Sequence, residues 1–228
     1  MEEFRKILEQ LHLNPQDLQL YQTAFTHRSF LNESKEAKQS NERLEFLGDS
    51  VLSFIISSFL YQKRPQDTEG NLTNLRAFIV KTDSLAKVAR GLHLGKFLKL
   101  SRGEEVSGGR ENSQLLANTY EAVLGAIFRD QGIEGATKFV QLTLLPIFEE
   151  EIEKGAPPDP KSKLQELVQN KFQISPKYRI LETVGPDHAK EFKVGVFIQG
   201  KQVGEGMGTN KQQAEEESAR QALEKLSK

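Results

Sequence analysis

A proline-rich segment divides this 228-residue chain into two regions with different hydrophobic patterns. Residues 153–163, EKGAPPDPKSK, hold three prolines and a glycine among charged residues, a composition typical of a linker. Before this segment apolar residues recur at helical spacing, and after it alternating patterns typical of strands enter. The sequence therefore predicts two units, residues 1–153 and 162–228, joined by a linker over 154–161.

The first region is predicted to be all-helical. Helical spacing recurs in stretches that include residues 44–61, 71–91, 113–131 and 136–153, with short breaks containing Gly, Asn or Ser. Runs with a period of two residues are nearly absent there, so a helical bundle is the expected architecture.

The second region is predicted to have the order α-β-β-β-α, which makes the whole chain α+β. Its helical patterns cover residues 161–172 and 210–226, and its strand patterns cover 177–185, 191–199 and 201–208. In the middle strand Phe192, Val194, Val196 and Ile198 fall on one face, as a half-buried antiparallel strand requires.

Composition excludes some classes of protein and leaves others open. The absence of cysteine excludes disulfides and thiolate metal sites and is consistent with a reducing cytoplasm. No signal peptide is visible at the N-terminus, and the most apolar run, residues 51–61, is too short to cross a bilayer, so no membrane association is expected. The net charge of −1 does not favour a polyanion partner, so nucleic-acid binding would depend on local basic groups.

Three carboxylates gather on one face of a predicted apolar helix in residues 41–50, NERLEFLGDS. On a helical wheel Glu42, Glu45 and Asp49 fall within an arc of roughly 60°. The opposite side is expected to hold the apolar residues Leu44, Leu47, Val51, Phe54 and Ile55. Because Glu45 and Asp49 form a like-charge pair four residues apart, they repel each other unless a cation lies nearby.

A second helical stretch carries matching oxygen donors. Asn118 and Glu121 are three residues apart on one face of the stretch 113–131. If the two helices converge, these groups form a site for a hard divalent cation, which prefers oxygen ligands. The alternative is an acidic face that is simply solvated, which is common on helices. The four histidines show no spacing that suggests zinc.

Phe46 lies beside these carboxylates on the wheel, away from the leucines. An aromatic residue there is either an ordinary core phenylalanine or a contact across a homodimer interface, and we favour the second interpretation.

Several motifs resemble the ribonuclease III family. NERLEFLGDS matches the family's ten-residue signature in full, and supporting matches cover AFTHRSFLNE, TEGNLTNLRAFIVKTDSLAKVAR, EVSGGRENSQLLANTYEAVLGAIF and DPKSKLQELVQ. The resemblance covers nearly the whole chain. It implies a helical endonuclease domain that forms a homodimer, followed by a double-stranded-RNA-binding domain.

The resemblance also implies an activity and its residues. The family uses Mg²⁺, for which Mn²⁺ can substitute, to hydrolyse double-stranded RNA into products with 5′-phosphate and 3′-hydroxyl ends and short 3′ overhangs. Its roles in rRNA and mRNA processing imply a cytoplasmic enzyme. Mapped onto this chain, the catalytic residues are Asp49 and Glu121, and the metal ligands are Glu45, Asp49, Asn118 and Glu121. Glu42 and Glu69 are supporting acids, and Phe46 lies in the dimer interface.

One position departs from the family pattern. Asn118 stands where the best-known members carry Asp, which leaves a carbonyl oxygen but removes one negative charge and should weaken a cation site. The alternative function is therefore a double-stranded-RNA-binding protein whose cleavage is weakened or lost.

The matching RNA-contact positions in the second region are Gln165, Gln169, His188 and Lys211. The glutamines suit 2′-hydroxyls and base edges in a minor groove, His188 a second minor groove, and Lys211 the phosphates between them. Exposed glutamines and lone loop histidines are, in general, more often incidental. Lys211 is the single lysine at the start of the second helical pattern, and the acidic run EEE follows it at 215–217. We therefore expect weak, salt-dependent RNA binding by this unit.

Overall fold

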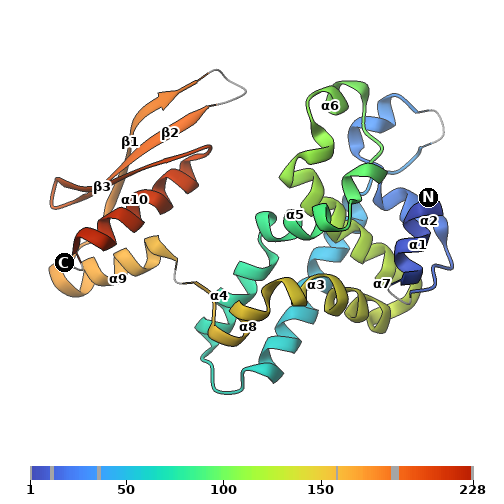
Figure 1. Cartoon of the computed structure of the whole chain (residues 1–228), viewed down its shortest axis with the longest axis horizontal. Coiled ribbons are helices and arrows are strands. Elements are labelled where there is room, and N and C mark those ends of the chain that lie inside the picture. Colours follow the sequence, from blue (N-terminus) through green and yellow to red (C-terminus); the bar gives the residue numbers. More distant parts are fainter. Residues whose placement is uncertain (1, 11–12, 35–36, 158, 186–189, 227–228) are drawn as a thin grey trace. The chain divides into compact units, whose positions relative to one another are not determined.

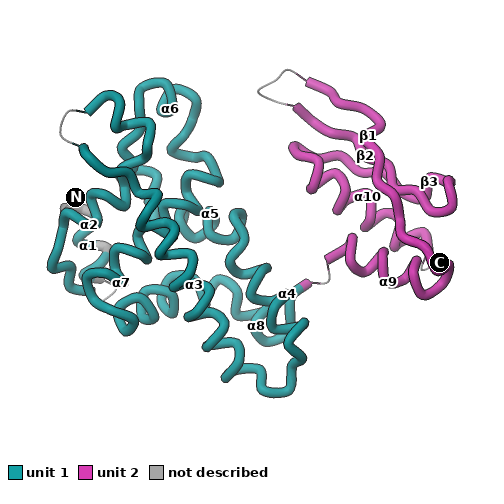
Figure 2. Tube along the Cα trace, turned by 180° about the vertical axis from the view of Figure 1, so that it is seen from behind, with its two compact units in different colours: residues 1–156 teal, residues 157–228 magenta. Residues whose placement is uncertain are grey.

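The computed structural model of the chain describes residues 2–10, 13–34, 37–157, 159–185 and 190–226 (Figure 1). The chain forms two units, residues 1–156 and 157–228, each of which is described by itself (Figure 2). The division point lies inside the segment predicted as a linker, whose bounds remain a prediction.

Unit 1 is helical in its described residues, apart from one isolated β-bridge between Thr26 and Lys99. Its α-helices are α1 (Glu2–Gln10), α2 (Leu18–Ala24), α3 (Glu42–Lys63), α4 (Glu69–Val80), α5 (Thr82–Gly91), α6 (Arg102–Val106), α7 (Ser113–Thr143) and α8 (Glu149–Lys154). Short 3-10 turns connect them: η1 (Arg28–Asn32), η2 (Leu94–Phe97), η3 (Gly109–Glu111) and η4 (Leu145–Phe148). The prediction of an all-helical first region is thus confirmed.

The long helices α3 and α7 pack against each other in the middle of unit 1 (Figures 1 and 2). Leu52 and Ile56 of α3 and Val123 and Ile127 of α7 are fully buried in the shared core. The wheel was wrong for Phe54, which is 62% exposed rather than part of the apolar side.

The structure divides two of the predicted helical stretches, 71–91 and 136–153, into shorter elements. The stretch 71–91 is split at Lys81, whose extended backbone (φ −65°, ψ 156°) separates α4 from α5. The predicted break between 113–131 and 136–153 lies at Gly132, where the backbone of α7 is non-helical and the helix kinks, and the second stretch is itself divided into the end of α7 at Thr143, η4 and α8. Gly132 has φ 69° and ψ −167°, a conformation that glycine adopts without steric cost.

Helix α3 contains the apolar run of residues 51–61 and continues beyond it at both ends. By length and composition alone α3 is sufficient to cross a membrane, and it is the one such helix among the described residues. A core helix meets the same criterion, and α3 lines the core of unit 1. The absence of membrane association therefore remains a prediction.

Unit 2 has the predicted order α9 (Pro160–Phe172), β1 (Lys177–Val184), β2 (Glu191–Ile198), β3 (Lys201–Gly208) and α10 (Lys211–Leu226). The three strands form an antiparallel sheet in the order β1-β2-β3. Val194, Val196 and Ile198 are buried, as predicted, and the core of this unit also holds Leu164 and Val168 of α9. The α+β class of the whole chain is confirmed.

Candidate active site

The backbones of α3 and α7 touch where the two helices cross. A Cβ atom on Gly48 would lie 1.8 Å from the carbonyl oxygen of Glu121, and one on Gly125 would lie 2.2 Å from that of Leu44. Only glycine fits at such an approach. Because Glu45 and Asp49 flank Gly48 on α3, the crossing brings both carboxylates next to Glu121.

The electrostatics of these carboxylates show that they act on one another. Burial, followed by the charges of Asp49 and Glu45, raises the pKa of Glu121 to about 8. Burial and the charge of Glu42 raise the pKa of Glu45, and a hydrogen bond from Asn118 opposes that rise. The structure therefore brings acids from two separate helices together, as the spacing predicted, while their functional roles remain predictions.

The Asn118 side chain is engaged within the protein. Its Oδ1 accepts from Gln114 Nε2 at 2.7 Å, and the side chain interacts with Glu45 closely enough to lower the pKa of that carboxyl. As the structure stands, the oxygen predicted to bind a cation is thus held by Gln114, one turn earlier on α7.

Glu42 belongs to the edge of the same site. Its carboxylate lies 3.4 Å from Arg28 Nη1 and accepts from Ser40 Oγ at 2.8 Å. The group borders a cavity of about 340 Å³ that is lined by His27, Arg28, Asn41, Glu42, Glu45, Leu98, Leu115, Asn118 and Thr119. Sequence reasoning did not single out Arg28 as a site residue, although it lies within the matched motif AFTHRSFLNE.

Glu69 lies apart from this group in its interactions. It begins α4, where the Thr68 side chain caps the helix, and its Oε1 accepts from Thr73 Oγ1 at 3.0 Å. Within the part of the chain that the structure describes, Glu69 is not among the groups that shift the pKa of Glu45 or Glu121. Its supporting role remains a prediction.

The donor set fits a hard divalent cation in its chemistry. Three carboxylates and one amide supply oxygen ligands, and a cation among them would relieve the repulsion between Glu45, Asp49 and Glu121. Over the described ranges, however, no three His, Cys, Asp or Glu side chains are arranged to hold a metal ion as they stand. The arrangement of the ligands around an ion thus remains a prediction, and it requires these side chains to rearrange when the ion binds.

Aromatic side chains are exposed along the outer face of α3. Phe46 is 77% exposed and Tyr61 73%, and Phe54 lies between them along the helix. The exposure of Phe46 excludes the interpretation that it is an ordinary core residue of a single copy of unit 1. Its role in a dimer interface remains a prediction.

In unit 2 the structure shows three of the four predicted RNA-contact residues. Gln165 and Gln169 are exposed on α9, and Lys211 is the exposed first residue of α10. Asn210 Oδ1 accepts from the Gln213 backbone N–H at 2.9 Å and so caps the start of α10. The fourth residue, His188, lies outside the described residues.

The acidic run at 215–217 is partly neutralised by neighbours within unit 2. Glu215 pairs with Lys161 Nζ at 2.5 Å, and Glu217 pairs with Arg220. The first of these pairs engages Lys161, a basic group near the start of α9 that could otherwise meet RNA phosphates. Weak RNA binding by this unit therefore remains a prediction.

Comparisons with known proteins identify the family of both units. The family model described as Ribonuclease-III-like matches residues 17–148, and the model described as Double-stranded RNA binding motif matches residues 160–226. A protein named Ribonuclease 3 from Streptococcus sanguinis is 45% identical over 230 residues, covering 100% of this chain and 98% of its own length. Another Ribonuclease 3, from Treponema denticola, is 44% identical over 225 residues, covering 99% of this chain and 92% of its own.

A solved structure shares the fold of unit 1. The nuclease domain of ribonuclease III from Campylobacter jejuni matches with a TM-score of 0.59 and 38% identity, covering 63% of this chain and 97% of its own. That domain has structural flexibility in a region involved in dimer formation, which is a property of the Campylobacter protein. By the match of both family models and by the full-length similarity to these relatives, this chain belongs to the ribonuclease III family.

Proposed function

We propose that this chain is a Mg²⁺-dependent endoribonuclease that hydrolyses double-stranded RNA, with Mn²⁺ able to replace Mg²⁺. The products carry 5′-phosphate and 3′-hydroxyl ends with short 3′ overhangs. Its place is the cytoplasm, where it processes rRNA precursors and mRNA. The observation that carries the proposal is the crossing at Gly48, which gathers Glu45, Asp49 and Glu121 in a chain that also has a double-stranded-RNA-binding unit.

The catalytic unit contributes a group of oxygen donors that needs no nucleophilic side chain. Asp49 and Glu121 are the catalytic carboxylates, and Glu45 and Asn118 complete the ligand set. When bound there, Mg²⁺ would supply water activation and charge relief at the phosphoryl oxygens and the leaving 3′ oxygen. Asn118 orients Glu45 through its side-chain interaction with that carboxyl, and Arg28 holds the supporting acid Glu42 at the rim. Glu69 supports the site from α4.

The RNA-binding unit would hold the duplex by its shape rather than by its sequence. Gln165 and Gln169, one turn apart on α9, donate and accept hydrogen bonds in one minor groove, and His188 enters a second. Lys211 meets phosphates between the grooves, together with the free N–H groups at the start of α10.

Cleavage of both strands requires two such sites, so we propose a homodimer through the exposed face of α3. Phe46 is the anchor of this interface, because a large aromatic side chain that is 77% exposed in one copy gains much by burial in another.

The test is cleavage of a long RNA duplex by the full chain, with and without Mg²⁺. Glu121→Gln should abolish cleavage while leaving duplex binding unchanged. Glu134→Gln provides a matched control, because Glu134 is exposed on the same helix beyond the kink. Ligation of an adapter to the products, which requires a 5′-phosphate, tests the chemistry of the product ends. An absence of products at every Mg²⁺ concentration would overturn the proposal.

The second candidate function is a double-stranded-RNA-binding protein with weakened or lost cleavage. The observation in its favour is the hydrogen bond from Gln114 that occupies the Asn118 oxygen. This candidate predicts that the chain binds duplex RNA but cleaves it only after Asn118→Asp.

A further inference from the structure

Arg64, directly after the end of α3, is tied to the end of α8 at the start of the inter-unit linker. Its Nη1 donates to the backbone oxygens of Ile152 at 2.8 Å and Glu153 at 2.5 Å. Asp67 holds the same guanidinium from the other side, through Nε and through Nη2 at 3.1 Å. Both charged side chains are only 18% exposed, so this interaction is better shielded from solvent and salt than a surface ion pair.

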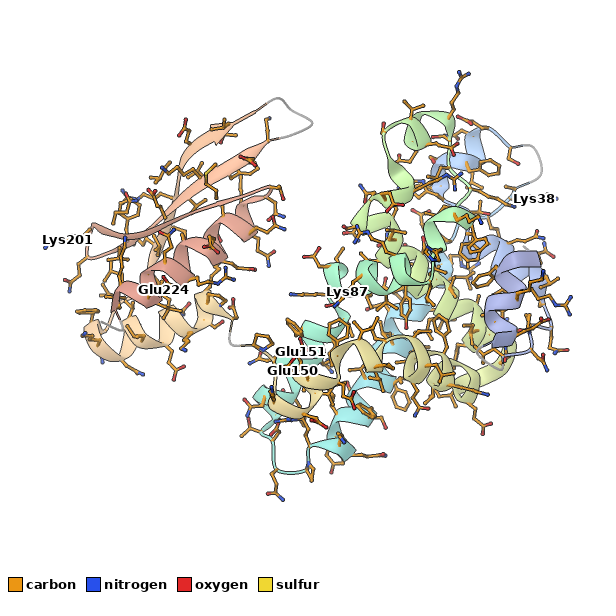
Figure 3. The ribbon with its side chains drawn as sticks, in the orientation of Figure 1. Lys38, Lys87, Glu150, Glu151, Lys201 and Glu224 are labelled. Carbon is orange, nitrogen blue, oxygen red and sulfur yellow. The ribbon has the colours of Figure 1, made fainter. Side chains whose placement is uncertain are left out.

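Helix α8 needs such a partner to persist. It has only six residues, and helices this short are marginal in water without tertiary contacts. The last carbonyl groups of any helix lack partners within the helix. Arg64 satisfies two of those carbonyls in α8, and Ile152 adds a buried side chain. Figure 3 labels Glu150 and Glu151 in this helix.

The chain leaves unit 1 immediately after this clamp. The Gly155 N–H still donates to Glu151 at 2.8 Å, and Ala156 packs against the core of unit 1. On the far side, Asp159 caps α9: its carboxylate accepts from the backbone of Ser162 at 3.0 Å, and Pro160 takes the first helical turn. Between the anchored residues Ala156 and Asp159 the sequence has two residues, both proline.

We propose that Arg64 is a positioning residue for RNA binding, because its clamp on α8 keeps the tether between the two units at two residues. The inference rests on the proposed function, in which both units bind one duplex. Three peptide links span at most about 11 Å, so the clamp limits how far the RNA-binding unit can move from its attachment point. A short tether keeps the local concentration of the second unit high once the first has bound.

Loss of the clamp lengthens the tether. Without Arg64 the end of α8 frays from residue 153, so the free segment grows from two residues to about six. Once a flexible tether is longer than the distance it must span, effective concentration falls roughly as the −3/2 power of tether length, and for this threefold change that scaling gives about a fivefold loss. The measured consequence is a fivefold rise in Kd for a duplex long enough to engage both units. The rate at saturating RNA is unchanged.

The experiment compares Arg64→Met with insertion of Gly-Ser-Gly-Ser between residues 157 and 158 in the full chain. Duplex Kd is measured by fluorescence anisotropy without divalent ions, so that it reads the tether even if the chain does not cleave. Each change alone should raise Kd several-fold. The double variant should raise it less than the product of the two effects, because the insertion has already lengthened the tether.

Asp130→Asn controls for a general loss of stability in unit 1. Asp130 accepts from Tyr21 Oη at 2.8 Å and from the backbone of Gln16 at 2.9 Å, a polar network within unit 1 that involves no linker residue. This variant should leave Kd unchanged at a temperature where it is folded. The proposal is overturned if Arg64→Met binds duplex as tightly as wild type, if it acts no differently from Asp130→Asn, or if the inserted linker leaves Kd unchanged.

Discussion

The helix crossing at Gly48 makes a sharp prediction for the variant Gly48→Ala. The added Cβ would lie 1.8 Å from the Glu121 carbonyl oxygen, and real Cβ atoms essentially never approach within 3.0 Å of a neighbour. The obstacle is backbone in a packed interior, so α3 and α7 must separate by at least 1.2 Å. Overpacking of this kind costs about 1 to 3 kcal/mol, and the higher helix propensity of alanine offsets at most about 1 kcal/mol of that cost.

The catalytic effect should exceed the effect on stability. Asp49 lies on α3 and Glu121 lies on α7, so separating the two helices moves the carboxylates apart. A misplacement of about 1 Å can cost about 100-fold in rate, and we expect a loss of that order in kcat/KM for duplex cleavage. Urea unfolding followed by circular dichroism gives the stability, and cleavage is measured at a temperature where the variant is folded.

Gly91→Ala is the matched control. Gly91 ends α5, and a Cβ there would meet nothing within 4 Å. This variant should keep full activity and be as stable as wild type or slightly more stable. If Gly48→Ala retained wild-type stability and wild-type kcat/KM, the close approach of α3 and α7 would not define the site, and the reasoning would be refuted.

Three further predictions follow from the site, the exposed face of α3 and the cap of α9. Asn118→Asp should lower the Mg²⁺ concentration needed for half-maximal cleavage at least several-fold, because it adds a negative charge to the ligand set; an unchanged Mg²⁺ dependence would show that residue 118 is not a ligand. Phe46→Ala should shift sedimentation towards monomer, whereas Val106→Ala, at a residue that is 82% exposed on α6, should not; a Phe46→Ala protein that remained dimeric would contradict the interface. Asp159→Ala should destabilise unit 2 by about 1 kcal/mol through loss of the α9 cap. Partial burial raises the pKa of Asp159, but hydrogen bonds from Ser162 and Lys161 lower it more, so the folded pKa lies below the ordinary value. The stability that ionised Asp159 contributes is thus present above about pH 4 and lost as the pH falls further, and the wild type and the variant should converge in urea titrations near pH 2.

The features that the sequence predicted are those set by local patterns. The alternation Val194, Val196, Ile198 predicted β2 and its buried face, and the helical spacing from Leu44 onward predicted α3. The like-charge spacing of Glu45 and Asp49 indicated that a cation had to be near, and the separate pair of donors at 118 and 121 predicted a second helix, α7, whose Glu121 interacts with both carboxylates.

The features that the sequence missed depend on contacts between distant segments. The spacing of apolar residues cannot show that α3 and α7 touch at Gly48, because in the sequence this glycine is only a small residue within a predicted helix. Phe54 was misassigned since a wheel places residues around one helix but does not show where its partner helices end. Arg64 lies 88 residues from Ile152, so no local pattern could join them.

Metal binding to Glu45, Asp49 and Glu121 in the absence of RNA tests the central claim most directly. Mn²⁺ binding to the full chain without RNA, measured by electron paramagnetic resonance, should be weakened strongly by Asp49→Asn and by Glu121→Gln, which remove ligands from α3 and α7 respectively. Because one ion bridges both helices, the double variant should bind little worse than either single variant. Glu134→Gln should bind as wild type does. If Glu121→Gln bound Mn²⁺ with wild-type affinity, the two helices would not share an ion, and the proposed mechanism would be contradicted.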